Sequence, residues 1–409
     1  MNLYIFNESS RAAVYGIGTY IRELTSALKD SDINVCVVHL RSDQAEKEPE
    51  VTDGIRHFYI PAPVNQNTSL TRNRQSELYY LNVVYLLRLQ IKNTEKLVFH
   101  LNHNQNNKFA EILKRKFDCK IVTVVHYFNW RFSVYDNLQR LRPALNEEYL
   151  DSFGETLKKS EVEKSLWVNV DRVICLSNYM QEILCQYCRI TSSTISVIPN
   201  GLTDHAKIIS DVKFLRKKWK IALKEKVILF AGRLDEVKGL EYLLNAFREV
   251  LHTFPRCRLV IAGDGDYNKY TKESQDICTR ITYTGLLGKD QLYEWYCLAD
   301  MGIIPSLFEP FGYVAVEMMM HGLPIVATAT SGLNEVVDGT CGFKIPIIEH
   351  SDRVEIDTAI LAEKIIYLLQ HSAESKKMGQ NGRNRYLKEF TSESFKQKML
   401  DFYYSLYDS

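Results

Sequence analysis

Two glutamates, Glu309 and Glu317, are separated by seven residues in the segment Ser306–Thr328. The first stands in a loop that also holds Gly312, and the second lies on the helix expected to follow. Carboxylates placed in this way can accept hydrogen bonds from sugar and ribose hydroxyls. The unpaired N–H groups at a helix N-terminus attract a phosphate. Together these groups predict a binding site for a nucleotide sugar.

A pair of cations is the second feature with plausible chemistry. Arg233 follows Gly232 and the expected strand Lys226–Ala231, and Lys238 comes shortly after. Arginine offers a bidentate fork and lysine a point charge, so the two could neutralise a leaving diphosphate. Taken alone, an arginine and a lysine at this spacing more often lie on a solvated surface and bind no ligand. Beside the two glutamates, the pair favours a diphosphate site.

His126 ends the expected strand Lys120–His126 and precedes an aromatic run that includes Tyr127, Phe128 and Trp130. An imidazole at a strand end could bond a sugar hydroxyl or donate to a phosphate oxygen. A lone histidine is usually structural, and the aromatic residues are also ordinary core residues.

Gly16 and Gly18 follow the first expected strand and open a helix, so the backbone there could approach a phosphate or an acceptor. A simple tight turn explains them equally well. Ile21 replaces the third glycine of the dinucleotide fingerprint, and no acidic residue ends the strand Asn34–Leu40. NAD binding is therefore disfavoured.

Gly263 and Gly265 are interpreted as a loop near the nucleobase, and Asp264 and Asp266 as turn residues rather than a metal-binding D-x-D pair. No metal site is predicted. The pair His100 and His103 lacks a third ligand at zinc-like spacing, and Cys185 and Cys188 form a single C-x-x-C; both pairs are interpreted as structural.

Composition excludes several classes of protein. The 409 residues are 45% hydrophobic and 25% charged with a net charge of +1, which is typical of a soluble globular protein and does not indicate nucleic-acid binding. We expect no membrane span and no signal peptide. The nine cysteines are an odd, scattered set, so a reducing cytoplasmic location is expected.

Alternating short apolar runs and amphipathic stretches predict parallel sheets covered by helices in two successive α/β halves. The expected strands are Leu3–Phe6, Asn34–Leu40, Ile55–Tyr59, Leu97–Leu101, Lys120–His126, Arg172–Leu176, Thr194–Ile198, Lys226–Ala231, Arg258–Ala262, Ile281–Tyr283, Met301–Pro305 and Pro324–Thr328. The expected helices are Gly18–Lys29, Ser76–Lys92, Asn107–Lys116, Leu157–Asn169, Asn178–Tyr187, Asp211–Leu223, Leu240–Phe254, Asp290–Cys297, Ile356–Gln370, Ser372–Glu389 and Ser392–Tyr407.

The two halves meet near the turn Pro199–Gly201. We expect an N-terminal acceptor-binding domain at 1–203, a nucleotide-sugar-binding domain at 204–390, and a C-terminal helix at 391–409 that packs back on the first domain. Ligands of doubly wound sheets bind beyond the carboxyl ends of the strands, where the residues above are expected to lie.

An ordered set of motifs resembles the retaining glycosyltransferases of family 4, which have the two-domain GT-B fold of facing Rossmann-like domains. The motifs are V-V-H at 124–126, V-I-P-N-G at 197–201, F-A-G-R-L-D-E-V-K-G at 230–239, V-I-A-G-D-G at 260–265, A-D-M-G-I-I-P-S at 299–306, E-P-F-G-Y-V-A-V-E at 309–317, and S-G-L-N-E-V-V-D-G at 331–339. These matches run over nearly the whole chain. In the N-terminal loop, Tyr15 precedes Gly16 where many relatives have a second glycine.

The resemblance implies a role for each site residue. Arg233 and Lys238 would hold and stabilise the departing diphosphate, Glu309 would contact the transferred sugar, and Glu317 would bind the ribose hydroxyls. The remaining implied positions are the phosphate-binding backbone at Phe311, Gly312 and Tyr313, a histidine near the reacting centre at His126, and the glycine loop between donor phosphate and acceptor at Gly16 and Gly18.

The implied reaction is a metal-independent, front-face transfer in which the leaving phosphate takes the acceptor's proton. No cofactor is needed besides the donor, a UDP- or GDP-linked sugar. The acceptor would be a hydroxyl of a glycan, a lipid-linked saccharide or a peptide. Two alternatives are a sugar-nucleotide epimerase of the same fold and a non-catalytic nucleotide-sugar binder.

Peripheral contact with the inner face of a membrane is a further expectation. The stretch Lys108–Lys116 is basic and amphipathic, which suits anionic lipid, although such a helix is more often simply solvated.

Overall fold

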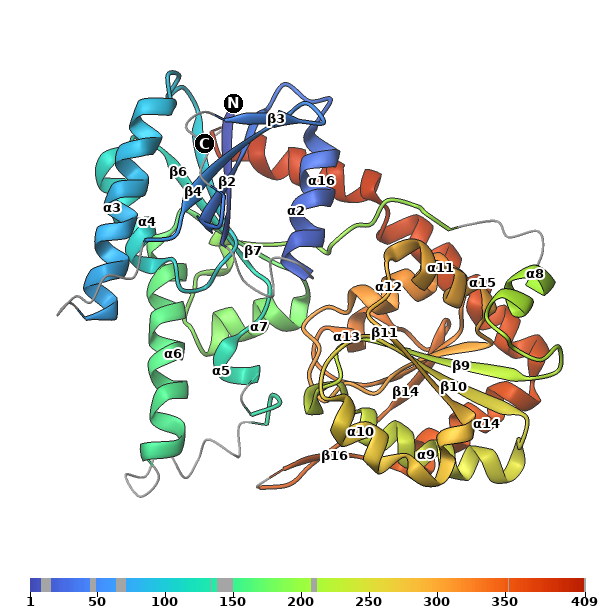
Figure 1. Cartoon of the computed structure of the whole chain (residues 1–409). Coiled ribbons are helices and arrows are strands. Elements are labelled where there is room, and N and C mark those ends of the chain that lie inside the picture. Colours follow the sequence, from blue (N-terminus) through green and yellow to red (C-terminus); the bar gives the residue numbers. More distant parts are fainter. Residues whose placement is uncertain are drawn as a thin grey trace. The chain divides into compact units, whose positions relative to one another are not determined.

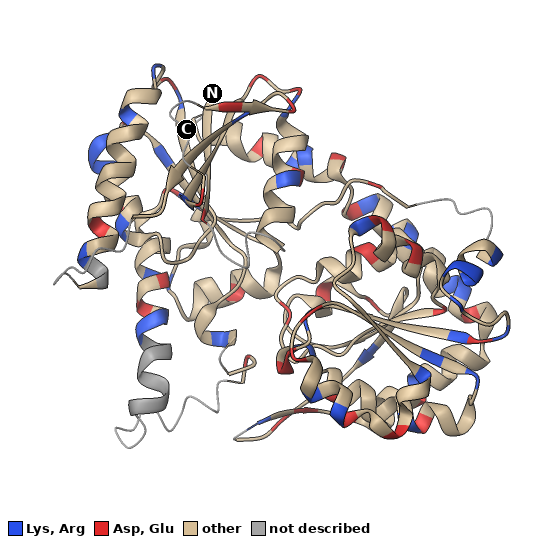
Figure 2. Ribbon diagram, in the orientation of Figure 1, with Lys and Arg blue, Asp and Glu red and all other residues tan. Residues whose placement is uncertain are grey.

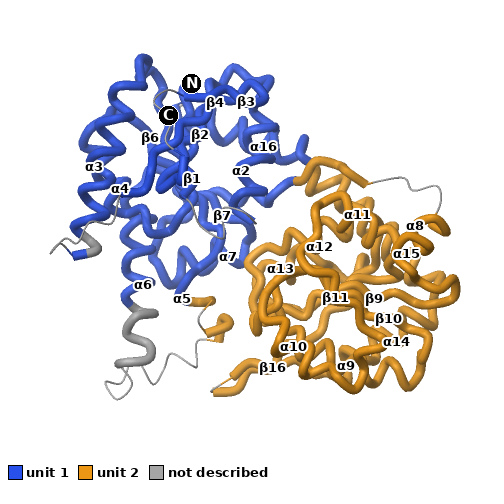
Figure 3. Tube along the Cα trace, viewed as in Figure 1, with its two compact units in different colours: residues 1–130, 147–201, 392–409 blue, residues 131–146, 202–391 orange. Residues whose placement is uncertain are grey.

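The computed structural model describes residues 1–8, 16–44, 49–63, 71–132, 134–137, 150–206, 212–351 and 353–407. The chain forms two compact units, coloured separately in Figure 3. Unit 1 comprises Met1–Trp130, Glu147–Gly201 and Ser392–Ser409, and unit 2 comprises Arg131–Asn146 and Leu202–Thr391. Each is an α/β unit, and basic and acidic residues are interspersed over both (Figure 2).

Unit 1 is built on an eight-stranded sheet in the order β3-β4-β2-β1-β5-β6-β7-β8, in which only β3 pairs antiparallel (Figure 1). The strands are β1 Asn2–Glu8, β2 Asn34–Ser42, β3 Glu50–Thr52, β4 Ile55–Pro61, β5 Leu97–Leu101, β6 Lys120–Val125, β7 Arg172–Cys175 and β8 Ile195–Val197. The helices are α2 Gly16–Leu28, α3 Arg72–Gln90, α4 Asn107–Lys116, α6 Leu150–Asn169, α7 Asn178–Gln186 and α16 Ser392–Ser405, with α5 Asn129–Phe132 crossing the boundary between the units.

Unit 2 is built on a six-stranded, all-parallel sheet in the order β11-β10-β9-β12-β13-β14, and a separate antiparallel hairpin pairs β15 with β16. The strands are β9 Lys226–Ala231, β10 Cys257–Ala262, β11 Ile281–Gly285, β12 Met301–Ile304, β13 Ile325–Thr328, β14 Gly342–Ile345, β15 Ile347–Glu349 and β16 Val354–Ile356. The helices are α8 Val212–Lys218, α9 Leu240–Thr253, α10 Tyr267–Glu273, α11 Lys289–Leu298, α12 Tyr313–Met320, α13 Leu333–Val336, α14 Thr358–Gln370 and α15 Ser372–Glu389.

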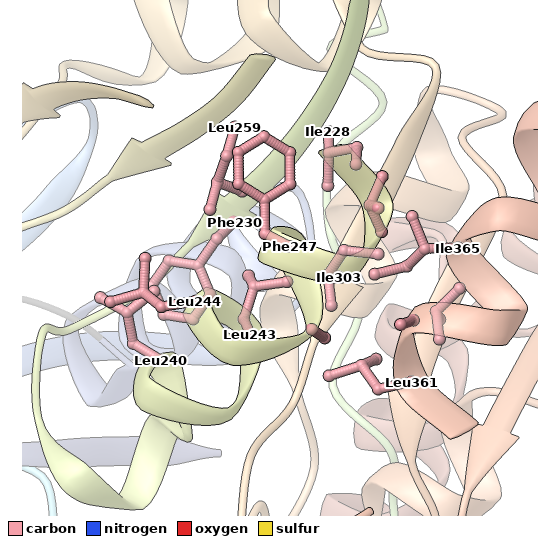
Figure 4. Packing of buried hydrophobic residues seen from close by; sticks show 14 of the residues in the cluster. Ile228, Phe230, Leu240, Leu243, Leu244, Phe247, Leu259, Ile303, Leu361 and Ile365 are labelled. Atoms are coloured by element: carbon pink, nitrogen blue, oxygen red, sulfur yellow. The ribbon is translucent and has the colours of Figure 1, made fainter. Parts of the chain in front are cut away.

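The core of unit 2 shows why these segments form these elements. The central strands are continuous apolar runs because both faces of a parallel sheet are covered. On α9, apolar residues recur at the spacing of one helix face, and they pack on β9, β10, β12 and α14 (Figure 4). The residues labelled there are Ile228, Phe230, Leu240, Leu243, Leu244, Phe247, Leu259, Ile303, Leu361 and Ile365.

The last helix, α16, packs on α2 of unit 1, as predicted. The rings of Tyr20 and Phe395 lie 5.7 Å apart between centroids, and the hydroxyl of Tyr403 lies 2.7 Å from Nδ1 of His100. Tyr403 and His100 are fully buried, so this bond satisfies polar groups that water does not reach. The C-terminal segment is thereby part of the core of unit 1.

The doubly wound α/β class is confirmed, and the predicted strands and helices coincide with observed elements. Their boundaries differ most for α6, which begins at Leu150 instead of Leu157, and for α8, which ends at Lys218 instead of Leu223. Sequence reasoning missed the short elements β3, β14, β15, β16, α5, α10 and α13. It also did not anticipate that the segment Arg131–Asn146 belongs to unit 2. Within the described residues, no helix has the length and apolar character that crossing a bilayer requires.

Candidate functional site

Three neighbouring strands of unit 2 end in loops that bond to one another. The N–H of Leu234, after β9, donates to the carbonyl of Asp264, after β10, at 2.8 Å. The N–H of Leu307, after β12, donates to the carbonyl of Val237 at 2.7 Å. Because these loops share backbone hydrogen bonds, the side chains that they carry are held at one edge of the sheet.

Gly263 and Gly265 allow this close approach of loops. Gly263 has φ +151°, and a Cβ there would lie 1.8 Å from the carbonyl oxygen of Gly232. A Cβ on Gly265, at φ +147°, would lie 2.4 Å from the carbonyl oxygen of Leu234. The close packing of the loops therefore explains why glycine stands at both positions. Their location beside a nucleobase stays a prediction.

Asp235 organises the two predicted cations. Its Oδ1 accepts a hydrogen bond from the N–H of Lys238 at 3.2 Å, which caps the 3₁₀ turn Glu236–Lys238. Its Oδ2 lies 3.0 Å from Nη2 of Arg233. The Arg233 side chain keeps about a third of its surface exposed. One carboxylate thus fixes the loop and the guanidinium while leaving Arg233 accessible to a ligand.

Lys238 forms an ion pair with Glu309, which brings together two residues far apart in sequence. Both side chains are about one-fifth exposed. The backbone of Glu309 is anchored as well: its N–H donates to Oγ of Ser331 at 3.0 Å, and its carbonyl accepts from the N–H of Leu333 at 3.0 Å. The predicted sugar-binding carboxylate is therefore fixed by its charge partner and by its own main chain.

Gly312 is the N-cap of α12 and lies beside this ion pair. It has φ +98°, a conformation that favours glycine, and a Cβ on it would lie 3.4 Å from Cγ of Glu309 and 3.0 Å from Leu333. Phe311 and Tyr313 flank it with ring centroids 5.6 Å apart. The positive end of the α12 dipole is therefore next to Glu309.

Glu317 lies on α12 and is nearly inaccessible, with 3% of its side chain exposed. It forms an ion pair with Lys289 and accepts a hydrogen bond from the hydroxyl of Tyr296 at 2.9 Å. Sequence reasoning missed both partners, because they come from α11 and no local pattern connects them to Glu317. A carboxylate has about four acceptor positions, and the contact of Glu317 with a ribose hydroxyl stays a prediction.

His126 follows β6 in unit 1 and is neutral. Its Nε2 lies 3.0 Å from Oδ1 of Asn102, and the Asn102 amide nitrogen donates to the carbonyl of Phe6 at 3.1 Å. The amide oxygen therefore faces the ring, which assigns the proton to Nε2 and leaves Nδ1 as an acceptor. Burial, with smaller contributions from His103 and His100, holds the pKa of His126 well below its usual value.

Glu163, another residue that sequence reasoning missed, supports the chain just after His126. Its Oε1 accepts hydrogen bonds from the Asn104 amide at 2.9 Å, the Asn129 amide at 2.6 Å and the Asn129 N–H at 3.1 Å. Glu163 is 1% exposed, and burial raises its pKa to about 7. The only sequence signal was its position on α6, which is common to many solvated glutamates.

Gly16 and Gly18 lie at the start of α2, with Gly16 exposed and Gly18 buried. Tyr15, the unusual residue before them, lies outside the described residues. His100 is buried and bonded to Tyr403, in keeping with the structural interpretation. None of the nine cysteines forms a disulfide, and the described residues contain no group of three or more potential metal ligands.

Two family models match the chain, and together they cover most of it. "Glycosyltransferase Family 4" matches residues 14–205, and "Glycosyl transferases group 1" matches residues 225–371. A glycosyltransferase of Methanocaldococcus jannaschii is 34% identical over 41% of this chain and 44% of its own length. A lipopolysaccharide 1,2-N-acetylglucosaminetransferase of Salmonella typhimurium is 30% identical over 46% of this chain and 52% of its own. The chain thus spans about half the length of these curated relatives.

Solved structures extend the likeness in fold to the whole chain. A sucrose-phosphate synthase from Thermosynechococcus elongatus superposes with a TM-score of 0.78 at 21% identity, covering 100% of this chain and 99% of its own. The Anabaena protein HepE, in complex with UDP and glucose, gives 0.73 at 19% identity over 99% of this chain and 100% of its own. The chain therefore belongs to the group 1, family 4 glycosyltransferases and has a GT-B-type fold of two parallel Rossmann-like sheets.

Proposed function

We propose that this chain is a retaining glycosyltransferase that moves a sugar from a nucleotide-diphosphate sugar to an acceptor hydroxyl. The observation that carries the proposal is the connected edge of unit 2, where Asp235 joins Arg233 to Lys238, Lys238 pairs with Glu309, and Glu309 lies against Gly312. Two cations and a helix N-terminus are the groups that a diphosphate requires.

In the proposed reaction, the bond between the sugar's anomeric carbon and the β-phosphate oxygen breaks, and the phosphate keeps the electron pair. The acceptor oxygen forms its bond on the same face of the sugar and gives its proton to the leaving phosphate. Arg233, Lys238 and the start of α12 stabilise the negative charge that develops on that phosphate. No separate base and no metal are needed in this scheme.

The other site residues have supporting roles in this proposal. Glu309 contacts the transferred sugar and Glu317 accepts hydrogen bonds from the ribose hydroxyls. His126 accepts a hydrogen bond from a sugar hydroxyl through Nδ1, since its Nε2 proton faces Asn102. Gly16 and Gly18, at the start of α2, lie between the donor phosphate and the acceptor in this proposal.

UDP is the first nucleotide to test, because the structural neighbour HepE binds UDP and glucose, and GDP is the second. The acceptor is proposed to be a glycan, a lipid-linked saccharide or a peptide. The names of two relatives, a lipopolysaccharide 1,2-N-acetylglucosaminetransferase and an alpha-monoglucosyldiacylglycerol synthase, favour a cell-envelope saccharide or lipid as the acceptor. The proposed location of the reaction is the cytoplasm or the inner face of the membrane.

A turnover assay tests this function. The full chain is incubated with UDP- and GDP-sugars, with and without an acceptor panel, in the presence and absence of EDTA. We expect acceptor-dependent release of nucleoside diphosphate, unchanged by EDTA, and a product with the donor's anomeric configuration. Conversion of the donor to an epimer without acceptor would identify an epimerase instead. Binding without turnover across the panel would indicate a non-catalytic binder.

A further inference from the structure

The segment Arg131–Asn137 comes from the first half of the sequence but belongs to unit 2 (Figure 3). Its end is fastened by Asn137, which is fully buried. The Asn137 amide donates to the carbonyl of His350 at 2.6 Å and to that of Arg353 at 3.3 Å. Both carbonyls flank the turn of the β15–β16 hairpin, so the hairpin holds the segment.

Two further contacts give the segment a defined shape. Tyr135 and Asp136 have φ values of 50° and 65°, a left-handed conformation that is costly for residues other than glycine. The Arg131 guanidinium pairs with Asp136 across this turn. The hydroxyl of Tyr135 donates to the carboxylate of Glu236 at 3.2 Å. The surrounding contacts must compensate for the backbone strain at Tyr135 and Asp136. Such strain is expected in a segment held in one conformation.

This anchoring places Phe132 against the cation that the proposed mechanism uses. Cζ of Arg233 lies 5.7 Å from the centroid of the Phe132 ring, within the range of a cation–π contact. The same ring meets Phe308 edge to face, with centroids 6.1 Å apart and planes at 75°. Phe308 directly precedes Glu309. The Phe132 ring therefore contacts both the loop that carries Arg233 and the loop that carries Glu309, the residues proposed to bind the diphosphate and the sugar.

We propose that Phe132 is a positioning residue for Arg233. The inference rests on the proposed function. An arginine side chain loses conformational entropy when it binds a phosphate. An aromatic ring that already holds the guanidinium in place lowers this entropic cost. Asp235 holds the guanidinium by charge and Phe132 holds it by its ring face.

A double-mutant cycle on the full chain tests this role. Phe132→Leu, Arg233→Ala and the combined variant are compared with the parent for affinity to UDP and GDP and for kcat and KM with the donor found in the turnover screen. We expect Phe132→Leu to lower kcat about tenfold in the parent. In the Arg233→Ala background we expect it to change neither kcat nor affinity, because it acts through the arginine.

Phe343→Leu is the matched control, since it removes an aromatic ring beneath a different cation of unit 2, Lys364, 5.4 Å away. We expect it to leave kcat unchanged. Phe132→Tyr keeps the ring and should restore the parent's kcat. Asn137→Ala, which releases the end of the segment, should reproduce the loss in the parent and not in Arg233→Ala. Melting temperatures are recorded for every variant to identify one that fails to fold.

Equal losses from Phe132→Leu with and without Arg233 would overturn the positioning role, as would an unchanged kcat in Phe132→Leu. Those outcomes leave the proposed function standing if Arg233→Ala is itself impaired. If Arg233→Ala binds nucleoside diphosphate and turns over donor like the parent, the proposed function of Arg233 fails and this inference fails with it.

Discussion

In unit 2, the loops at the carboxyl edge of the sheet hold opposite charges in pairs, Lys238 with Glu309 and, on neighbouring helices, Lys289 with Glu317. The corresponding edge of unit 1 presents groups such as the neutral imidazole of His126 and the amides of Asn102 and Asn104. The same architecture therefore supports two chemistries. The charged edge is suited to a diphosphate, whereas the amide and imidazole edge is suited to neutral hydroxyls.

The largest expected effect comes from removing the cations of unit 2. Arg233→Ala and Lys238→Ala should each lower kcat by about 10²–10³-fold, because each is proposed to stabilise charge that develops on the leaving phosphate. Steady-state kinetics with saturating donor measures this. Lys364→Ala, which removes a lysine of unit 2 that pairs with Glu363, is the control and should retain the parent's rate. An unaltered kcat in Lys238→Ala would contradict the proposal that Lys238 stabilises the leaving phosphate.

The second-largest expected effect is the pH dependence of the folding stability that Glu163 contributes to unit 1. Because burial raises the Glu163 pKa from 4.5 to about 7, its contribution to stability is fully present below pH 4.5 and is lost as pH rises through 7. The loss amounts to about 3 kcal/mol. The charged and titratable groups that bear on this carboxyl are Lys159, on its own helix, and Tyr127.

Denaturant unfolding of the parent and of Glu163→Gln between pH 4 and pH 8.5 isolates this contribution, since other groups titrate in both proteins. We expect the stability of the parent relative to the variant to fall by about that amount over the range. A difference that does not vary with pH would show that Glu163 does not titrate as its surroundings predict.

Glu317→Ala should weaken nucleotide binding by about 10- to 100-fold, because the carboxylate proposed to accept hydrogen bonds from the ribose hydroxyls is lost. Titration calorimetry measures the change. Tyr296→Phe keeps the carboxylate and removes only the 2.9 Å hydrogen bond, so its effect should be smaller. Equal affinities in the parent and Glu317→Ala would place the ribose elsewhere.

The smallest effect is expected at His126. His126→Ala should lower kcat about tenfold while leaving the affinity for nucleoside diphosphate unchanged, since a neutral acceptor of one hydrogen bond is removed. The depressed pKa also means that no step in kcat near pH 6.5 belongs to this residue. A step in the pH–rate profile near pH 6.5 that disappears in His126→Ala would contradict the neutral assignment.

The sequence predicted the fold well, because long apolar runs such as Lys226–Ala231 and amphipathic helices such as Leu240–Thr253 have strong periodicity. It also predicted residues in the loops that follow strands, including Arg233 after β9 and Glu309 after β12. Short elements such as β15 and β16 carry too few residues for a pattern to appear.

Long-range partners were beyond the reach of sequence reasoning. The pairing of Glu317 with Lys289, the hydrogen bonds of Glu163, and the contact of Phe132 with Arg233 all join separate elements. No spacing rule connects such residues, because packing of whole helices and loops decides which side chains meet. The same reason explains why the role of Asn137 in fastening its segment could not be foreseen.

The most direct test of the central claim is calorimetric titration of the full chain with UDP, GDP and ADP and with the matching nucleosides. We predict that one nucleoside diphosphate binds at least about 100-fold more tightly than its nucleoside, and that Arg233→Ala/Lys238→Ala abolishes this difference. If no diphosphate binds at millimolar concentration, or if the double variant retains the preference, the charged edge of unit 2 is not a diphosphate site.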